Sequence, residues 1–431
     1  MPAESPGVSP AQLFSDMGPH QRMVSTSSAE AQTYFNQGLN WMYAFNHDEA
    51  IRSFKRAAEL DPDCAMAWWG VAVSEGPNYN DPVMTEQRSS AAWEALKNAV
   101  DLIDNTTPVE RALIEALKHR YAEPWPEDRT SLDEAYSRAM EQVRETYPDD
   151  SDVSTLSAES LMVLAPWQLY TEDGQPKEET RTLQIVSVLE HAMRLAPNNP
   201  GANHLYIHAV EPSNDPDRGL VAADRLADLV PSSGHLLHMP SHIHVKTGRW
   251  EEAVVQNQKA MESDARYREL SPKQEIQHMY MVHNSHMLAY AAMMSGREKE
   301  AMKAARAMWE HIPDETMNEV GYLFDRWMGS VYDVQKRFGR WDDLLAEAPP
   351  PDFMKITKAT WRAHRAIAYA AKKEIEEAER EYAEFLKAME DIPEDTLWDQ
   401  DSALKVLSVS DYFIQGEIAL QQGDLERAAE L

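Results

Sequence analysis

The chain has almost no cysteine, and its acidic residues far outnumber its basic ones. Cys64 is the single cysteine among 431 residues, which excludes an intramolecular disulfide and any metal cluster built from thiolates. The 72 acidic and 41 basic side chains give a formal net charge of -31 at pH 7. A nucleic-acid backbone or an anionic membrane surface would be repelled by this charge. We therefore predict no nucleic acid and no membrane among the partners.

Long apolar runs and targeting signals are also missing. No run of about 18 apolar residues is present, so the sequence predicts no transmembrane helix. The N-terminal sequence MPAESPGVSPAQLFSDMG has no basic region followed by an apolar one, and it is therefore no secretory signal. We expect a cytoplasmic protein. Because residues 1–28 are rich in Pro, Ser and Gly, we predict a loosely ordered segment there.

Helix-forming residues with apolar periodicity make up most of the remaining chain. Hydrophobic residues account for 43% of the sequence, and 12 Trp argue against disorder. Ala, Glu, Leu, Met, Arg and Lys dominate the periodic segments, whereas strand-like alternation is nowhere sustained. The sequence predicts an all-α protein, with helices from Ser28 or Ala29 onward and a single domain over residues 29–431.

An internal repeat of 34 residues is the clearest pattern in the sequence. Counted from Ala31, small residues or aromatics occupy the positions where two paired helices approach each other, and a proline follows the second helix. These positions, from the eighth to the thirty-second, hold Gly38, Trp41, Ala50, Phe54, Ala57 and Pro62. This is the pattern of a tetratricopeptide repeat (TPR), a helix–turn–helix unit that stacks into a solenoid.

Further units repeat this pattern less closely. Pro197 and Pro231 lie one repeat length apart, and four later turns share a Gly followed by acidic residues and Ala or Leu: TGRWEEA, SGREKEA, FGRWDDL and QGDLERA. We predict a right-handed superhelix of about seven to nine helix pairs. The final GDLERAAEL stops inside a second helix, whereas solenoids usually end in a polar capping helix. We therefore expect a chain truncated at its C-terminal end.

Histidine is concentrated in one short part of the chain. Nine of the 15 histidines fall in a window of less than a fifth of the sequence: His204, His208, His235, His238, His242, His244, His278, His283 and His286. The remaining six are isolated, and we interpret each as a hydrogen-bonded polar residue without a role in a site: His20, His47, His119, His191, His311 and His364.

The repeat register places most of the clustered histidines on one helix face. With repeats starting at Pro200, Gly234 and Val282, the groove-lining fifth and ninth positions hold His204, His208, His238, His242 and His286. Second positions hold His235 and His283, and a twelfth position holds Glu211. His244 falls at an eleventh position and is expected to be internal. Glu159, at a ninth position of the preceding repeat, is a further candidate ligand whose alternative is a salt bridge.

Histidines at i and i+4 face the same way on a helix. Neighbouring helices lie about 8–10 Å apart, so imidazoles from two such helices can meet at one ion with metal–nitrogen bonds of about 2.1 Å. The sequence predicts a transition-metal centre of Fe, Cu or Zn. Its expected ligands are His204, His208, His238, His242 and His286. The expected catalytic or additional groups are Glu211, His235 and His283.

Two other interpretations of the cluster stay open. The histidines could form a hydrogen-bonded ladder that stiffens the groove, or they could line a surface that binds a peptide. The lead hypothesis is a metal-dependent enzyme that acts on a small molecule or peptide in the concave groove. Oxidation is slightly favoured over hydrolysis, because more than one ion could bind. The alternative is a non-enzymatic TPR scaffold for protein or peptide partners.

Two blocks of sequence resemble a poorly described, His-rich bacterial TPR subfamily. The first is FNHDEA followed by DPDCAMAWWG, and the second is HLYIHAVE followed by GHLLHMPSHIHVKTGRWEEAV. The resemblance runs from about Val24 to the chain end and implies a TPR solenoid, but no particular reaction. TPR proteins that grip a C-terminal carboxylate need Lys, Asn and Arg in the groove. Here these positions are mostly His, Glu and Tyr, which argues against such an adaptor role.

Overall fold

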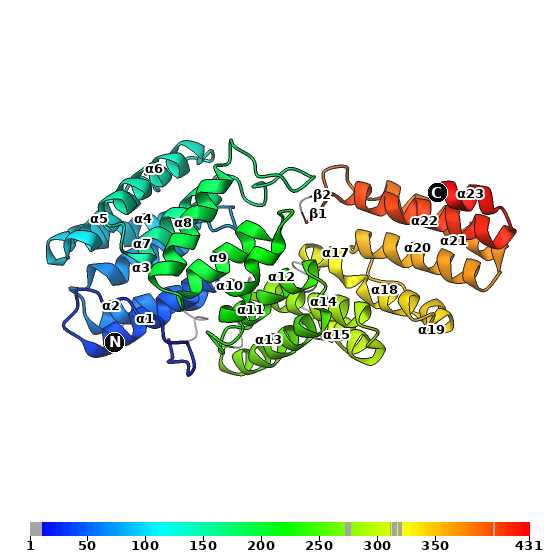
Figure 1. Ribbon diagram of the computed structural model, residues 1–431, viewed down its shortest axis with the longest axis horizontal. Coiled ribbons are helices and arrows are strands. Elements are labelled where there is room, and N and C mark those ends of the chain that lie inside the picture. Colours follow the sequence, from blue (N-terminus) through cyan, green and yellow to red (C-terminus); the bar gives the residue numbers. More distant parts are fainter. Residues whose placement is uncertain (1–10, 272–276, 311, 313–316, 318–320, 400) are drawn as a thin grey trace. The chain divides into compact units, whose positions relative to one another are not determined.

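The computed structural model describes residues 11–271, 277–310, 312, 317, 321–399 and 401–431. They form two compact units, Met1–Gln274 and Glu275–Leu431, each of which is described by itself. The first unit contains α1 (Ala29–Tyr43), α2 (His47–Leu60), α3 (Ala65–Glu75), α4 (Glu86–Asp101), η1 (Ile103–Asn105), α5 (Pro108–Leu117), α6 (Thr130–Thr146), α7 (Ser151–Met162), α8 (Thr182–Leu195), α9 (Pro200–Val210), η2 (Pro216–Gly219), α10 (Leu220–Leu226), α11 (Gly234–His238), α12 (Pro240–Lys246) and α13 (Trp250–Leu270) (Figure 1).

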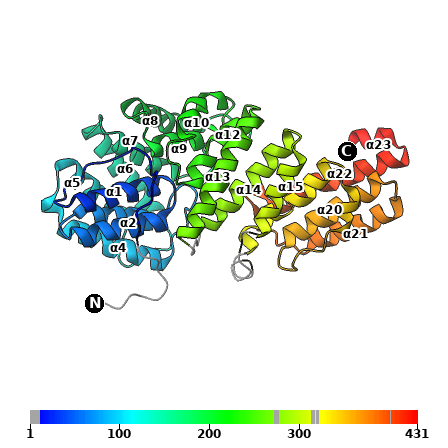
Figure 2. The ribbon, with the colours of Figure 1, turned by 90° about the horizontal axis from the view of Figure 1, so that it is seen from below.

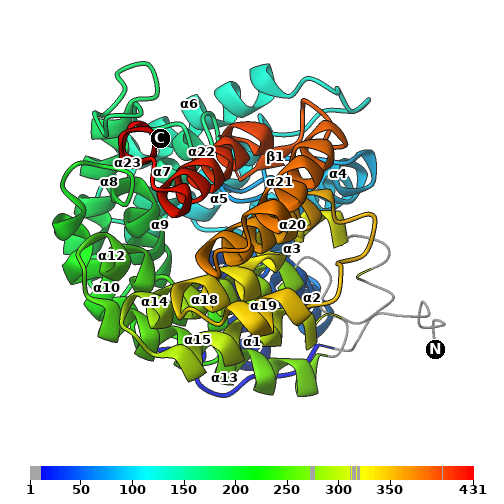
Figure 3. The same cartoon turned by 90° about the vertical axis from the view of Figure 1, so that its right-hand side faces the viewer.

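The described residues of the second unit are also helical, apart from two strands of two residues each. It contains α14 (Gln277–Met294), α15 (Glu298–Glu310), η3 (Gly321–Leu323), α17 (Asp325–Met328), α18 (Ser330–Arg337), α19 (Trp341–Ala346), α20 (Lys355–Ala371), α21 (Ile375–Glu390), β1 (Leu397–Trp398), β2 (Asp401–Ser402), α22 (Ala403–Gln422) and α23 (Leu425–Glu430). The two strands are antiparallel, and α20, α21 and α22 lie side by side (Figure 3). The all-α prediction is confirmed. Among the helices of the described residues, none combines the length and apolar character that crossing a membrane would require.

The pair α1–α2 shows why the repeat pattern forms a helical hairpin. Ser28 caps α1 by accepting a hydrogen bond from the backbone N–H of Ala31, so the helix begins where the sequence predicts it. A Cβ atom at Gly38 would lie 2.8 Å from the ring of Phe54, which is fully buried. Glycine is therefore required for α1 and α2 to pack side by side with this ring between them (Figure 2).

The turns within helix pairs share one left-handed residue, two positions before the second helix. In four turns it is a glycine with positive φ: Gly248, Gly296, Gly339 and Gly423. The α20–α21 turn has Lys373 there, and the α1–α2 turn has Phe45 with φ 56°. A bulky residue in this conformation costs about 1–2 kcal/mol relative to glycine. Phe45 is therefore a strained exception in a turn that normally uses glycine.

Local signals also fix the helices that carry most of the clustered histidines. Asn199 caps α9, and Pro200 occupies its first turn, where a missing N–H is harmless. Ser233 caps α11, and Pro240 separates α11 from α12. The predicted repeat starts at Pro200 and Gly234 coincide with helix starts. The third predicted start, Val282, is wrong as a helix start, because it lies inside α14.

Residues 11–28 carry no helix, but this segment is tied to the helical core by a buried ionic network. Asp152 accepts hydrogen bonds from His20 at 2.9 Å, Arg22 at 3.2 Å and the Tyr43 hydroxyl at 2.8 Å. Asn199, the cap of α9, donates to the same carboxylate at 3.1 Å. The network thus joins the N-terminal segment to α1, α7 and the start of α9.

Replacing Asp152 with alanine is expected to lower the free energy of unfolding by about 3–5 kcal/mol, because Arg22 would stay buried without one of its two carboxylate partners. Chemical denaturation followed by circular dichroism measures this change. Asp149→Ala is the matched control, since Asp149 is exposed on the same turn. Equal stability of the Asp152 variant and the wild type would show that the network contributes nothing.

The same network predicts a pH dependence. Burial by itself would raise the pKa of Asp152, but the His20 hydrogen bond and the charges of His20 and Arg22 outweigh it and lower the pKa to about 2. A carboxyl with a depressed folded-state pKa stabilises the protein above its unfolded-state pKa of about 3.9, and this contribution is lost as the pH falls further. The stability difference between wild type and Asp152→Ala should therefore shrink between about pH 4 and pH 2.

Candidate metal centre

Five histidines of the first unit form one buried cluster. Each residue is at most 9% exposed, and all come from α9, α11 and α12. The members are His204, His208, His235, His238 and His242. We call this group the histidine cluster. Four of the five belong to the ligands predicted from the sequence, and His235 was predicted as a catalytic or additional group.

Three of these histidines point their ring nitrogens toward one another. The Nε2 atoms of His204 and His235 are 3.1 Å apart. One ligand atom from each of His204, His208 and His235 lies within 4.8 Å of the other two. The ring centroid of His204 lies 4.9 Å from the ring centroid of His208 and 4.9 Å from that of His235. Two adjacent helices, α9 and α11, therefore bring three imidazoles to one place.

The other two histidines form a second close pair. The Nε2 atoms of His238 and His242 are 2.8 Å apart, across the helix break at Pro240. This pair adjoins the first group, because the ring centroids of His208 and His242 are 5.8 Å apart. The HxxxH spacing thus places both rings on one side of the kinked helix, as predicted.

Hydrogen bonds at Nδ1 define the tautomers of four cluster histidines. His204 Nδ1 lies 2.7 Å from the Tyr43 carbonyl oxygen, and His238 Nδ1 lies 2.7 Å from Asn257 Oδ1. The amide orientation of Asn257 is set by its own Nδ2, which donates to the Ala253 carbonyl. Because both partner atoms can only accept, these Nδ1 atoms must carry the proton.

Glu211 plays the same part for the other two rings. Its Oε1 accepts from His208 Nδ1 at 2.9 Å, and its Oε2 accepts from His242 Nδ1 at 2.6 Å. Burial would raise the pKa of the Glu211 carboxyl, but the neighbouring His242 and the two imidazole hydrogen bonds hold this pKa well below its usual range. The carboxylate stays ionised, and each of its two oxygens accepts from one of these rings.

A proton on Nδ1 of a neutral imidazole leaves a lone pair on Nε2. Burial, with neighbouring histidines acting in the same direction, lowers the pKa of His204 and His238 well below the usual value. Burial also lowers the pKa of His208, although Glu211 opposes it. The Nε2 atom of His208 is buried and has no hydrogen-bond partner among the described residues. The cluster therefore presents Nε2 lone pairs toward its own interior.

Three aromatic side chains enclose His208, and the sequence analysis identified none of them. Phe45 lies nearly parallel to His208 with a centroid distance of 6.2 Å, Tyr79 is tilted at 5.5 Å, and Trp167 meets it edge-on at 5.1 Å. Both Phe45 and Trp167 have a left-handed backbone, with φ 56° and 60°. The missing glycine in the turn AFNHDEA was a signal for Phe45, but Trp167 had no comparable signal.

The other predicted site residues have different surroundings. His283 and His286 belong to α14 of the second unit, where both rings lie beside Trp327 at 5.3 and 6.0 Å. Their participation in a metal centre stays a prediction. Glu159 makes no hydrogen bond to the cluster; burial raises its pKa to about 7, and Arg120 acts in the opposite direction. His244 is buried, as expected.

The isolated histidines mostly have ordinary polar partners. His20 and His364 contact Asp152 and Asp333, both at 2.9 Å. His191 contacts the Pro148 carbonyl at 2.8 Å. Burial lowers the pKa of His47 to about 3. His119 is exposed. His311 lies outside the described residues.

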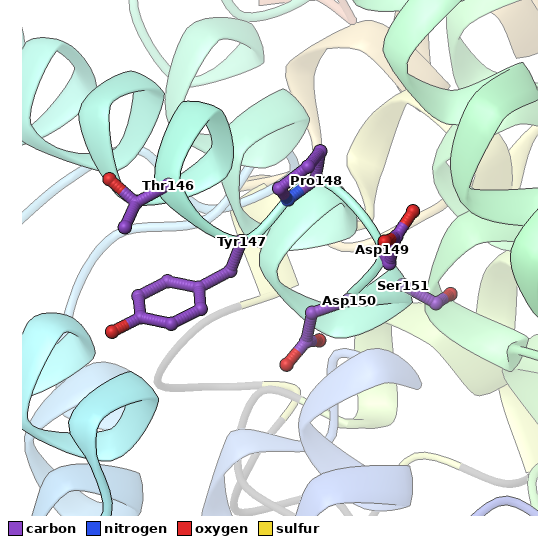
Figure 4. Close-up of a pocket in the computed structure, with 6 residues that line it drawn as sticks. All are labelled: Thr146, Tyr147, Pro148, Asp149, Asp150 and Ser151. Atoms are coloured by element: carbon purple, nitrogen blue, oxygen red, sulfur yellow. The ribbon is translucent and has the colours of Figure 1, made fainter.

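An open surface hollow lies at the turn between α6 and α7, away from the histidine cluster in sequence. Its lining consists of Thr146, Tyr147, Pro148, Asp149, Asp150 and Ser151. These side chains fan out from the turn and do not converge on a common point (Figure 4). The hollow therefore lacks the converging polar groups that a ligand site needs.

The structure and the sequence comparisons agree on the class of protein. Paired helices joined by short turns define an all-α helical-repeat architecture. The family model described as Tetratricopeptide repeat matches residues 31–64, starting at the residue from which the repeat was counted. The chain therefore contains a tetratricopeptide repeat within an all-α fold of the TPR type. Its membership in the His-rich bacterial subfamily stays a prediction.

Comparisons with whole proteins add little beyond this. No curated protein matches the sequence. Solved structures that align with it include the human IFIT1 dimer with PPP-AAAA, with 15% identity, 94% coverage of this chain, 89% of that chain and a TM-score of 0.39. Yeast Tom70 aligns with 12% identity, 94% and 84% coverage and a TM-score of 0.34. At such low scores neither likeness carries an inference about ligands or partners.

Proposed function

We propose that the histidine cluster binds one or two transition-metal ions and is the active centre of a metal-dependent enzyme built on a TPR scaffold. The observation that carries this proposal is the protonation pattern: Nδ1 of His204, His208, His238 and His242 each faces an acceptor. The Nε2 atoms of these four rings are therefore left to face the interior of the cluster. Lone pairs at 2.8 Å repel each other unless a cation or a proton lies between them.

The distances in the cluster favour a metal ion. Two nitrogens that bind one ion at about 2.1 Å lie about 3.0–3.4 Å apart for bond angles between square and tetrahedral. The 3.1 Å separation of His204 and His235 falls in this range, and the 2.8 Å separation of His238 and His242 falls just below it. Imidazole nitrogens suit Fe, Cu and Zn.

The surrounding groups match those that usually support metal-bound histidines. Such histidines donate their other N–H to a carboxylate, a carbonyl or an amide oxygen, which fixes the ring and its tautomer. Here the three kinds of acceptor are Glu211, the Tyr43 carbonyl and Asn257. We therefore assign Glu211 to orienting two ligands and supplying one negative charge, in place of the catalytic role expected from the sequence.

The ligands of the proposed site are neutral imidazole nitrogens, which leave the positive charge of a bound ion largely uncompensated. Such ligands suit a reaction that needs an electron-poor ion. Such an ion supplies either Lewis acidity for a hydrolysis or redox chemistry for an oxidation. We favour the oxidative class, because the three-nitrogen and two-nitrogen groups adjoin each other and each leaves coordination positions open. The substrate is a small molecule or a peptide.

Elemental analysis tests the proposal directly. The wild-type protein, purified without a His tag from metal-replete medium, is expected to contain about one or two equivalents of Fe, Cu or Zn. The double variant His238→Ala and His242→Ala should lose at least half of this metal, because it lacks one of the two groups. His119→Ala is the control, since it removes an exposed histidine outside the cluster and should keep the wild-type metal content.

A folded, metal-free wild-type protein would overturn the proposal. In that case the cluster would be a ladder of histidines that share protons, and the TPR helices would act as a scaffold for peptide or protein partners. Peptide-array binding to the metal-free protein would then identify the ligand.

A further inference from the structure

The histidine cluster is buried except for His242, which is 9% exposed, and this raises the question of how a ligand reaches the His204–His208 side of the cluster. His204 and His238 have no exposed surface, and His208 is only 1% exposed. The three aromatic neighbours of His208 differ in this respect. Tyr79 is fully buried and Phe45 is 3% exposed, whereas Trp167 is partly exposed. Trp167 is thus the member of this shell with the most exposed surface.

The position of Trp167 in the chain allows it to move without unfolding a helix. It lies between the end of α7 at Met162 and the start of α8 at Thr182. This connection is tied down from Leu169 onward, because the Leu169 carbonyl accepts hydrogen bonds from the backbone of Lys177 and the hydroxyl of Thr182. Movement is therefore confined to the short stretch 163–168, and it has to break local backbone hydrogen bonds such as those from Ala165 N–H to the Met162 carbonyl and from Gln168 N–H to the Ala165 carbonyl.

Few interactions hold the Trp167 side chain over the cluster. The indole N–H donates no hydrogen bond to a described residue, and the ring is held by Tyr79 at 5.0 Å and His208 at 5.1 Å. Its backbone has φ 60°, a conformation that bulky residues rarely adopt. Strained backbones of this kind concentrate at ligand clamps and moving segments. A rotation of the backbone at Trp167 would relieve the strain and withdraw the ring.

We propose that Trp167 is the gate of the histidine cluster. In the closed state its indole edge covers His208, whose buried Nε2 has no partner, and a ligand reaches this atom when the segment 163–168 swings outward. Phe45 and Tyr79 form the fixed walls of the opening. The catalytic meaning of the gate rests on the proposed metal centre, whereas the covering of His208 does not require a metal.

Chemical modification of the metal-free protein tests the gate independently of metal binding. Diethyl pyrocarbonate acylates accessible, unprotonated imidazole nitrogens, and peptide mass spectrometry gives a rate for each histidine. The key variant is Trp167→Asn, because asparagine tolerates a left-handed backbone and removes the ring. We expect His208 to react at least about ten-fold faster in this variant than in the wild type. Trp167→Phe, which keeps an aromatic cover, should stay within about three-fold of the wild type.

Two internal references and one control variant separate gating from unfolding. Exposed His119 should react at the same rate in every variant, and buried His364 of the second unit should stay slow. Trp125→Asn removes another partly buried loop tryptophan of the first unit and should leave His208 slow. An unchanged His208 rate in Trp167→Asn would overturn the gate. Faster modification of His208, His20 and His364 together would also overturn the gate, because it would show that Trp167 is a structural residue.

Metal content tests the proposed metal centre separately from the gate. Elemental analysis of the same Trp167→Asn protein should give the wild-type metal content, since Trp167 offers no ligand atom. For the metal-loaded protein, removal by a chelator should be at least about ten-fold faster in Trp167→Asn. A metal-free wild type would remove the proposed function and leave the gate to be judged by the modification rates alone.

Discussion

Chelation of the bound metal from the wild-type protein is expected to lower the melting temperature of the first unit by about 10 °C. An ion that binds only the folded state at about a thousand times its Kd contributes about 4 kcal/mol. In a unit of this size each kcal/mol changes the melting temperature by about 2–4 °C. The cluster has an additional reason to respond, because without an ion only a shared proton can hold the Nε2 atoms of His238 and His242 at 2.8 Å. Differential scanning calorimetry with and without chelator measures the shift.

The response should shrink when one group of ligands is removed. The double variant His204→Ala and His208→Ala is expected to lose at least about half of the chelator-induced shift, because it keeps only the His238–His242 pair. His119→Ala should keep the full shift. A wild-type melting temperature that does not respond to chelator, in a protein shown to contain metal, would place the metal outside the histidine cluster.

Glutamine in place of Glu211 is expected to weaken metal binding by about 10–100-fold. The carboxylate accepts from two Nδ1–H groups at once, through one oxygen each. A glutamine amide offers one accepting oxygen and one donating nitrogen, so either His208 or His242 loses its acceptor. That ring would then turn or move its proton to Nε2, and a protonated Nε2 cannot bind a metal. Competition titration with a chromophoric chelator measures the change.

The same variant separates two roles for this residue. Glu159→Gln is the control, because it replaces another carboxyl of the first unit, one that is partly buried and makes no hydrogen bond to the cluster. If Glu211→Gln keeps the wild-type affinity but loses turnover, the residue acts on the substrate, as the sequence analysis expected. A loss of affinity in Glu211→Gln alone supports the orienting role.

The sequence predicted the scaffold well because helical repeats are specified by local patterns. Gly38, Phe54 and the Ser28 cap each act within one helix pair, so their spacing alone predicts the hairpin. The proximity of His204, His208, His238 and His242 was also expected from repeat register, because equivalent positions of stacked repeats face the same side. Pro240 did not disturb this, although it divides the predicted helix in two. The register placed these rings on an open groove, however, whereas all four are buried.

The rest of the site depends on contacts that no local pattern encodes. The Tyr43 carbonyl, which is the acceptor for His204, comes from a helix that precedes it by 161 positions. Asn257, the acceptor for His238, lies on α13 and had no motif of its own. Glu211 was identified as a site residue, but its role could not be deduced, since spacing does not reveal that both oxygens face imidazole N–H groups. Trp167 was missed because irregular connections have no periodicity from which a direction can be predicted.

Tyr43 connects the N-terminal segment to the histidine cluster, a link that the sequence of this segment does not suggest. Its hydroxyl donates to Asp152, beside His20 and Arg22, while its backbone carbonyl accepts from His204. A shortened protein that begins at the first helix would keep every proposed ligand and still lose two of the groups that brace this tyrosine. Residues 11–28 are therefore best regarded as part of the machinery that aims the first imidazole, and engineering of this protein should leave them in place.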